Sequence, residues 1–96
     1  MTAKPFRVSW ASSAQRDLTR LPEKIATAAV EFVYGTLADN PYRVGRELHL
    51  DLAGHHSARR GDYRVIYRID DVEHRIHIVT IDHRADVYRR RRPQAP

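Results

Sequence analysis

Residues 57–69 read Ser-Ala-Arg-Arg-Gly-Asp-Tyr-Arg-Val-Ile-Tyr-Arg-Ile, and this stretch decides the fold. Two strand-like runs flank Gly61-Asp62, a pair suited to a tight hairpin turn of two residues. Such a turn sets the facing pairs of the hairpin: Arg60 with Tyr63, Arg59 with Arg64, Ser57 with Ile66, and His55 with Arg68. Because side chains alternate along a strand, one side of the hairpin is expected to carry His55, Ser57, Arg59, Arg64 and Arg68.

The expected hairpin therefore collects arginines on one side. Like charges that face each other across a sheet are unfavourable, by about 0.2–1 kcal/mol for an exposed pair. The arginines on this face repel one another. An anionic partner that neutralises their guanidinium groups is the best explanation for such an arrangement. The pattern indicates a phosphate-bearing partner, with RNA first among the candidates.

Length and composition set bounds on the class of protein. The chain has 96 residues, a formal net charge of +5 and a sequence pI near 10.1, so we expect one small domain that attracts polyanions. A hydrophobic fraction of 42% and a charged fraction of 30% favour a folded domain over a disordered chain. The sequence has no cysteine, no apolar run of membrane-spanning length and no signal-peptide core, so we expect a cytoplasmic protein without contact to a membrane.

Apolar spacing predicts the other elements. Residues 6–10 alternate and predict a first strand, and a short helix capped by Ser12 or Ser13 should run from there to about Leu21. After Pro22, an apolar stripe predicts a helix of about 16 residues, with the inner positions Ile25, Ala28, Ala29, Phe32, Val33 and Leu37. Residues 42–52 show no clear period and predict a loop, and residues 75–82 predict the last strand.

The expected architecture is α+β, in the order β-α-α-β-β-β, with a helical hairpin packed on one face of a small, mainly antiparallel sheet. We expect a single domain over residues 1–88 and a basic C-terminal tail over residues 89–96. The six histidines show no H-x-x-x-H or H-E-x-x-H spacing, so neither a metal nor another cofactor is expected.

Two sequence blocks, in this order and spacing, resemble a known family. Residues 61–69 read Gly-Asp-Tyr-Arg-Val-Ile-Tyr-Arg-Ile and follow the strand and the helical pair, and residues 83–88 read His-Arg-Ala-Asp-Val-Tyr. The arrangement is similar to the RelE/ParE toxin superfamily, and most similar to its RelE branch, over about residues 6–90.

The resemblance implies a toxin of a type II toxin–antitoxin pair. RelE-type toxins are metal-independent endoribonucleases, called mRNA interferases, that cleave mRNA in the ribosomal A site and inhibit translation. A cognate antitoxin wraps and silences the toxin, and the complex binds operator DNA and represses its own operon. The resemblance also implies a concave basic surface on the side of the sheet away from the helices.

The resemblance assigns roles to individual residues. Arg64 matches the strand arginine that stabilises the phosphate. Arg84 matches the arginine of the final block, either as a phosphate contact or as an ion-pair partner of Asp82 or Asp86. Tyr88 matches the C-terminal tyrosine, which acts in acid–base chemistry or stacking, or packs the tail onto the sheet. The hairpin supplies the expected substrate-binding residues Arg59, Arg60, Arg68, His55 and Ser57.

In one respect the chain departs from the family. The family's enzymes carry paired lysines nine and seven residues before the strand arginine, where this chain has His55 and Ser57. Ser57 alone is no general base, and Arg59 supplies charge without proton transfer because a guanidinium stays protonated. A histidine is the natural substitute. We favour His83, at the expected end of the last strand, over the other candidates, His55 and His56.

Two alternatives stay open at this point. The missing lysines also suit a ParE-like toxin that inhibits DNA gyrase by binding and has no nuclease activity. They suit equally a toxin-derived module that retains only the binding of antitoxin and operator.

Overall fold

The computed structural model describes residues 4–83, with a five-stranded sheet at its centre in the order β1-β5-β4-β3-β2. β1 runs parallel to β5, and the other neighbouring strands are antiparallel. The strands are β1 (Arg7–Trp10), β2 (Arg46–Glu47), β3 (His56–Arg60), β4 (Tyr63–Asp70) and β5 (Arg75–His83).

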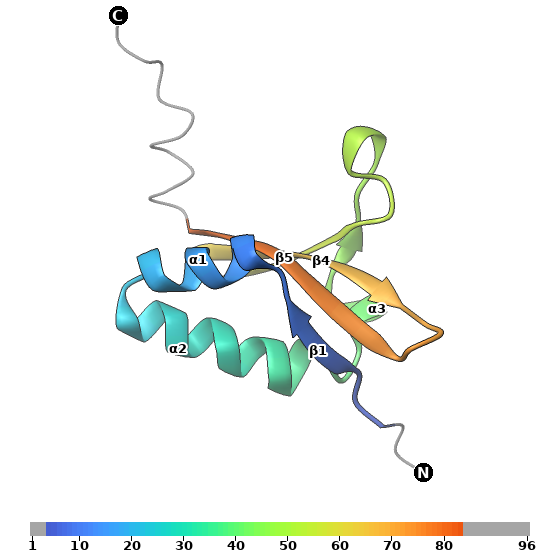
Figure 1. Cartoon of the computed structure of the whole chain (residues 1–96), viewed down its shortest axis with the longest axis horizontal. Coiled ribbons are helices and arrows are strands. Elements are labelled where there is room, and N and C mark those ends of the chain that lie inside the picture. Colours follow the sequence, from blue (N-terminus) through green and yellow to red (C-terminus); the bar gives the residue numbers. More distant parts are fainter. Residues whose placement is uncertain (1–3, 84–96) are drawn as a thin grey trace, which may run out of the picture.

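The two main helices follow each other as a hairpin on one side of the sheet (Figure 1). The second helix continues into a π-helical turn, in which the Ala38 N–H donates to the Val33 carbonyl at 2.9 Å. The helices are α1 (Ser12–Arg20), α2 (Glu23–Glu31), the π-helix η1 (Phe32–Leu37), α3 (Pro41–Val44) and the 3₁₀-helix η2 (Leu50–Leu52). The expected α+β architecture is confirmed, with three additions, the short elements α3, β2 and η2.

Apolar side chains between the helices and the sheet form one core. Every second residue of β4, from Tyr63 to Tyr67, is buried, as are Ile76, Ile78 and Ile81 of β5. Val33 and Leu37 of η1 meet them from the helical side and are fully buried. Burial of this apolar surface is the main stabilising term for a domain of this size.

The hairpin β3–β4 has the predicted register. Arg60 faces Tyr63, Arg59 faces Arg64 and Ser57 faces Ile66. Gly61 takes a φ of +59°, a conformation that side chains disfavour, which explains a glycine at the first position of the turn. The predicted pair of His55 and Arg68 does not form, because β3 begins one residue later and the His55 N–H donates to the Leu52 carbonyl.

Two predicted details of the helices are wrong. The residue before α1 is Ala11, and neither Ser12 nor Ser13 caps the helix. The Ser13 hydroxyl donates instead to the carbonyl of Val79, the residue that a shift of register in the β4–β5 ladder leaves without a facing partner. Ala28, predicted on the inner face, is exposed, because the helix contacts the sheet through Ala29 and the π-turn.

No helix within residues 4–83 is long and apolar enough to cross a membrane.

Candidate nucleic-acid interface

The face of the sheet away from the helices, here called the open face, carries three rows of mostly polar side chains. Arg59, Arg64 and Asp82 face one another across β3, β4 and β5. The next row holds Ser57, Ile66 and Thr80, and a third holds Arg68, His77 and Ser9. The residues between these positions on β3 and β4 point to the opposite, covered face, where they are buried. The alternation of side chains along each strand therefore places these arginines on one face of the hairpin and its core residues on the other.

A basic hollow of about 580 Å³ lies at one end of the open face. A volume of this order holds a small ligand or part of a larger one. We call it the arginine hollow, and it is lined by Arg43, Val44, Gly45, Arg46, Leu48, Ser57, Arg59 and Arg64.

The arginine hollow is strongly electropositive. Four guanidinium groups line it and no lining residue is acidic. Asp82 faces Arg64 in the register and is the nearest carboxylate on that row, so the cations outnumber it. Guanidinium groups gathered in this way suit bidentate contacts with phosphate oxygens.

Half of these arginines come from a segment that the sequence predicts to be a loop. Arg43 lies in α3 and Arg46 in β2, the strand next to β3, and both line the hollow together with residues of the hairpin. The sequence signal for them is the pair of arginines around Val44-Gly45, a run too short to show a period. The sequence therefore predicts one wall of the site, formed by Arg59, Arg64 and Ser57, but not the other.

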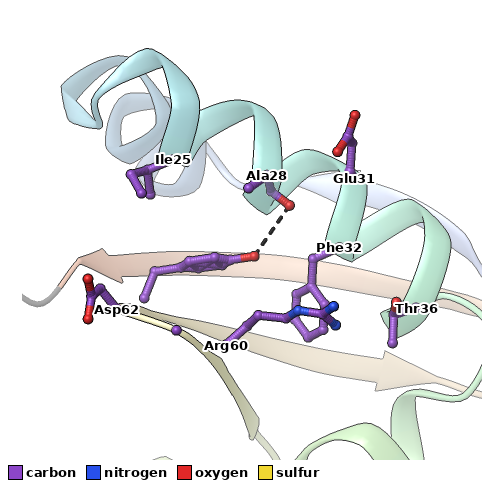
Figure 2. A pocket seen from close by; sticks show the side chains of 9 residues that line it. Ile25, Ala28, Glu31, Phe32, Thr36, Arg60 and Asp62 are labelled. Carbon is purple, nitrogen blue, oxygen red and sulfur yellow. Dashed lines mark hydrogen bonds between the residues drawn. The ribbon is translucent and has the colours of Figure 1, made fainter.

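Arg60, predicted to bind substrate, lies on the covered face. Its guanidinium carbon is 5.1 Å from the centre of the Phe32 ring, at a distance typical of a cation–π contact. Figure 2 shows Arg60 beside Phe32 and beneath the helix, in a separate hollow of about 540 Å³. The register explains the placement, because Arg60 faces the buried Tyr63 and not Arg64. Arg60 is thus on the opposite side of the sheet from the arginine hollow.

Tyr63 also lines that second hollow. Its hydroxyl donates to the Ala28 carbonyl at 3.3 Å, the dashed line in Figure 2. Burial raises the pKa of Tyr63, and the nearby charge of Arg60 lowers it in part. The phenol is therefore protonated at neutral pH and serves here as a hydrogen-bond donor.

Arg68 lies on the open face but outside the arginine hollow. It lines another hollow, of about 560 Å³, together with Ser9, His77 and the acidic pair Asp70 and Asp71. The Ser9 hydroxyl and His77 Nδ1 are hydrogen-bonded at 2.7 Å. Arg68 is thus separated from Arg59 and Arg64 by a row of the sheet.

The histidines considered for proton transfer do not line the arginine hollow. His83 faces Tyr63 in the register, and alternation puts its side chain on the covered face, away from Arg64. His55 precedes β3 and His56 stacks on Tyr67 at a centroid distance of 5.6 Å. The expectation that His83 lies beside the phosphate-binding arginines is therefore corrected by the register. Arg84 and Tyr88 lie outside the described residues.

Geometry and charge together define the class of molecule: a small α+β domain with one face covered by helices and an open face that carries a basic hollow. A family model for the ParE toxin of type II toxin–antitoxin systems matches residues 8–88. The chain therefore belongs to this family, which confirms the resemblance seen in the two sequence blocks.

Named relatives agree with this assignment. The chain is 58% identical to Toxin RelE of Mycobacterium tuberculosis (strain ATCC 25618 / H37Rv) over 85 residues, 88% of each chain. It is 51% identical to Toxin RelG of the same organism over 86 residues, 90% of this chain and 99% of that one.

Solved structures give the same fold. A chain of the toxin–antitoxin complex RelBE2 from Mycobacterium tuberculosis matches with a TM-score of 0.82 and 50% identity, over 85% of this chain and 94% of that one. A chain of the archaeal RelE–RelB complex from Pyrococcus horikoshii OT3 matches with a TM-score of 0.65 and 28% identity, over 84% and 97%. The chain is a toxin of the type II toxin–antitoxin class.

Proposed function

We propose that this toxin is a metal-independent endoribonuclease that cleaves mRNA in the ribosomal A site and so inhibits translation. The observation that carries the proposal is the arginine hollow, which four arginines line without an acidic residue among the lining residues. The identity to a protein named Toxin RelE supports the same interpretation.

The hollow is suited to the hardest part of RNA cleavage without metal. Attack of a 2′-hydroxyl on phosphorus builds negative charge on the phosphate oxygens, and preorganised cations stabilise that charge more than they stabilise the ground state. Arg64 and Arg59 face each other from adjacent strands, so the backbone holds them before the RNA arrives. In this proposal they bind the scissile phosphate.

The proton transfers need groups from outside the lining of the hollow. Its lining side chains are guanidinium, hydroxyl and aliphatic groups, and they include no histidine or carboxylate of the kind that usually serves as a general acid or base. Tyr88 is the proposed acid–base or stacking group and Arg84 a second phosphate contact, both from the segment that follows β5. His83 is no longer favoured, because its side chain lies on the covered face.

We further propose that a RelB-type antitoxin neutralises the toxin and that the complex binds operator DNA. Support comes from the matched structures, which are described as RelBE2 and RelE–RelB complexes. An antitoxin segment with carboxylates directed at the arginine hollow would block RNA by occupying the same cations.

Arg64→Ala tests the nuclease. We expect the variant to lose mRNA cleavage in cells that express the toxin alone, because the principal phosphate contact is gone, and to keep its fold, because Arg64 is exposed. Mapping of transcript ends after induction measures the cleavage. Arg20→Ala, an exposed arginine on α1 at the covered side, is the control for the change in charge. Codon-linked transcript ends from folded Arg64→Ala would contradict the assignment.

A second function is favoured by the lack of proton-transfer groups in the lining of the hollow. A ParE-like toxin that inhibits DNA gyrase by binding needs no such groups, and the family model itself carries the ParE name. Gyrase-linked DNA breaks after induction, without new mRNA ends, would establish this function and exclude the nuclease.

A further inference from the structure

The arginine hollow has two walls of different origin. One is the sheet wall, with Arg59 and Arg64 on paired strands. The other is formed by residues 41–47, here called the arm, which carry Arg43 and Arg46 and contribute α3 and β2. The arm pairs with the sheet at two positions only, Arg46 with Ser57 and Glu47 with His56. So short a strand cannot fix the arm by its own ladder.

A buried tyrosine fastens the start of the arm. The Tyr67 hydroxyl donates to the Pro41 carbonyl at 2.5 Å, and both residues are fully buried. Burial raises the pKa of Tyr67 to about 12, so the phenol keeps its proton and remains a donor at neutral pH. A buried hydrogen bond of this kind holds a chain segment in one position, because breaking it leaves two polar groups without partners.

A glycine fits the arm against the same tyrosine. A Cβ atom on Gly45 would lie 2.2 Å from the Tyr67 hydroxyl oxygen and 2.9 Å from the Ser57 carbonyl oxygen. The backbone of Gly45, with φ −107° and ψ −178°, is extended and open to any residue. The position therefore needs a glycine for space and not for conformation. Gly45 stands between Val44 and Arg46, so displacement there moves the arm arginines directly.

We propose that Tyr67 and Gly45 are positioning residues that lock the arm, so that Arg43 and Arg46 bind a second phosphate of the RNA beside the one bound by Arg59 and Arg64. The inference rests on the proposed function. It specifies the ligand as a single strand with consecutive phosphates, gripped from two sides. The arm arginines contact RNA, whereas Tyr67 and Gly45 act through them.

The salt dependence of binding measures how many phosphates of the RNA the protein neutralises. Each phosphate neutralised on a single strand contributes about −0.7 to the slope of log K against log salt concentration. Loss of both arm arginines should therefore reduce the magnitude of the slope by roughly 0.7, the contribution of the one phosphate that they are proposed to neutralise. A residue that only stabilises the fold would not change this slope in the folded protein.

The experiment measures binding of the full chain to a 2′-O-methyl RNA oligonucleotide, which lacks the attacking hydroxyl, over a series of KCl concentrations. The double variant Arg43→Ala/Arg46→Ala should show the reduced slope and keep its fold, because both side chains are exposed. Gly45→Ala should reduce affinity and slope in the same direction. Gly35→Ala, where an added Cβ meets nothing within 4 Å, is the matched control and should bind as the wild type does.

Loss of the tyrosine hydroxyl tests the lock without adding bulk. Tyr67→Phe removes the donor that holds the Pro41 carbonyl, so the folded variant should show lower affinity and a smaller slope than the wild type. Wild-type affinity and slope in the double arginine variant would overturn the proposal, whether or not the Gly45 variant folds. A folded Tyr67→Phe protein with wild-type affinity and slope would overturn the lock.

These outcomes are distinct from failure of the proposed function. A wild-type protein that binds the oligonucleotide with the expected slopes but cleaves no mRNA leaves the two-walled site intact and removes the nuclease. Cleavage by the wild type together with unchanged slopes in the arm variants would support the nuclease and overturn the two-walled site.

Discussion

The two faces of the hairpin β3–β4 share one backbone but differ in burial and in charge. On the covered face, Ala58, Val65 and Tyr67 are at most 1% exposed and belong to the core. On the open face, Arg59 and Arg64 are exposed and face each other with like charge. The first arrangement stabilises the fold and the second slightly opposes it. One hairpin thus carries stability on one side and the candidate function on the other, and substitutions should separate the two.

The largest effect on stability is expected at the covered face. Ile78→Ala removes a fully buried side chain between the sheet and the helices, and such truncations cost about 2–5 kcal/mol. Urea unfolding followed by circular dichroism measures the loss. Val72→Ala, at a residue 91% exposed, is the control and should change the free energy of unfolding by less than about 0.5 kcal/mol. Equal effects of the two substitutions would contradict the core described above.

An intermediate effect is expected where a polar group lies within the covered layer. The Asp17 carboxylate of α1 is buried and accepts the Ile81 N–H of β5 at 2.9 Å. Asp17→Ala leaves that N–H without its partner, which costs about 1–3 kcal/mol. The same unfolding measurement applies, with the exposed Asp39→Ala as the control for loss of a carboxylate. If Asp17→Ala is as stable as the control, this link between helix and sheet is not structural.

The smallest effect on stability, and the sharpest test of the comparison, is expected at the open face. Arg59→Ala removes one of two facing like charges, so stability should stay the same or rise by about 0.2–1 kcal/mol. Binding to the 2′-O-methyl RNA should weaken in the same variant, and Arg20→Ala should affect neither property. A destabilisation comparable to that of Ile78→Ala would show that Arg59 is structural, and the division between the two faces would fail.

Local patterns in the sequence are sufficient for the hairpin and the helical pair. Gly61-Asp62 fixes the turn, and the turn fixes which residue faces Arg64, so the register follows from two residues. The apolar stripe of α2 and η1 likewise predicts Phe32, Val33 and Leu37 in the core. These features depend on residues that are close together in the sequence, so the local pattern of residue types is enough to predict them.

The arm and the histidines cannot be predicted in this way. α3 and β2 are too short for a period, and the arm is held by contacts of Gly45 and Pro41 with the distant Tyr67. Nearness in sequence to Arg84 suggests a place for His83 in the site, whereas its face of the sheet depends on where β5 changes register. Half of the candidate site therefore follows from tertiary packing, which no local signal carries.

The order of the strands in the sheet also affects when, during synthesis, the toxin can complete its fold. β1 is synthesised before the other strands, and its neighbour in the sheet is β5, the last strand of the described chain. During translation β1 must wait without a strand partner until residues 75–83 have emerged, and pairing across so long a stretch of chain is slow. A nascent toxin thus cannot complete its sheet until its fifth strand has left the ribosome, so any activity that needs the full fold appears late in synthesis.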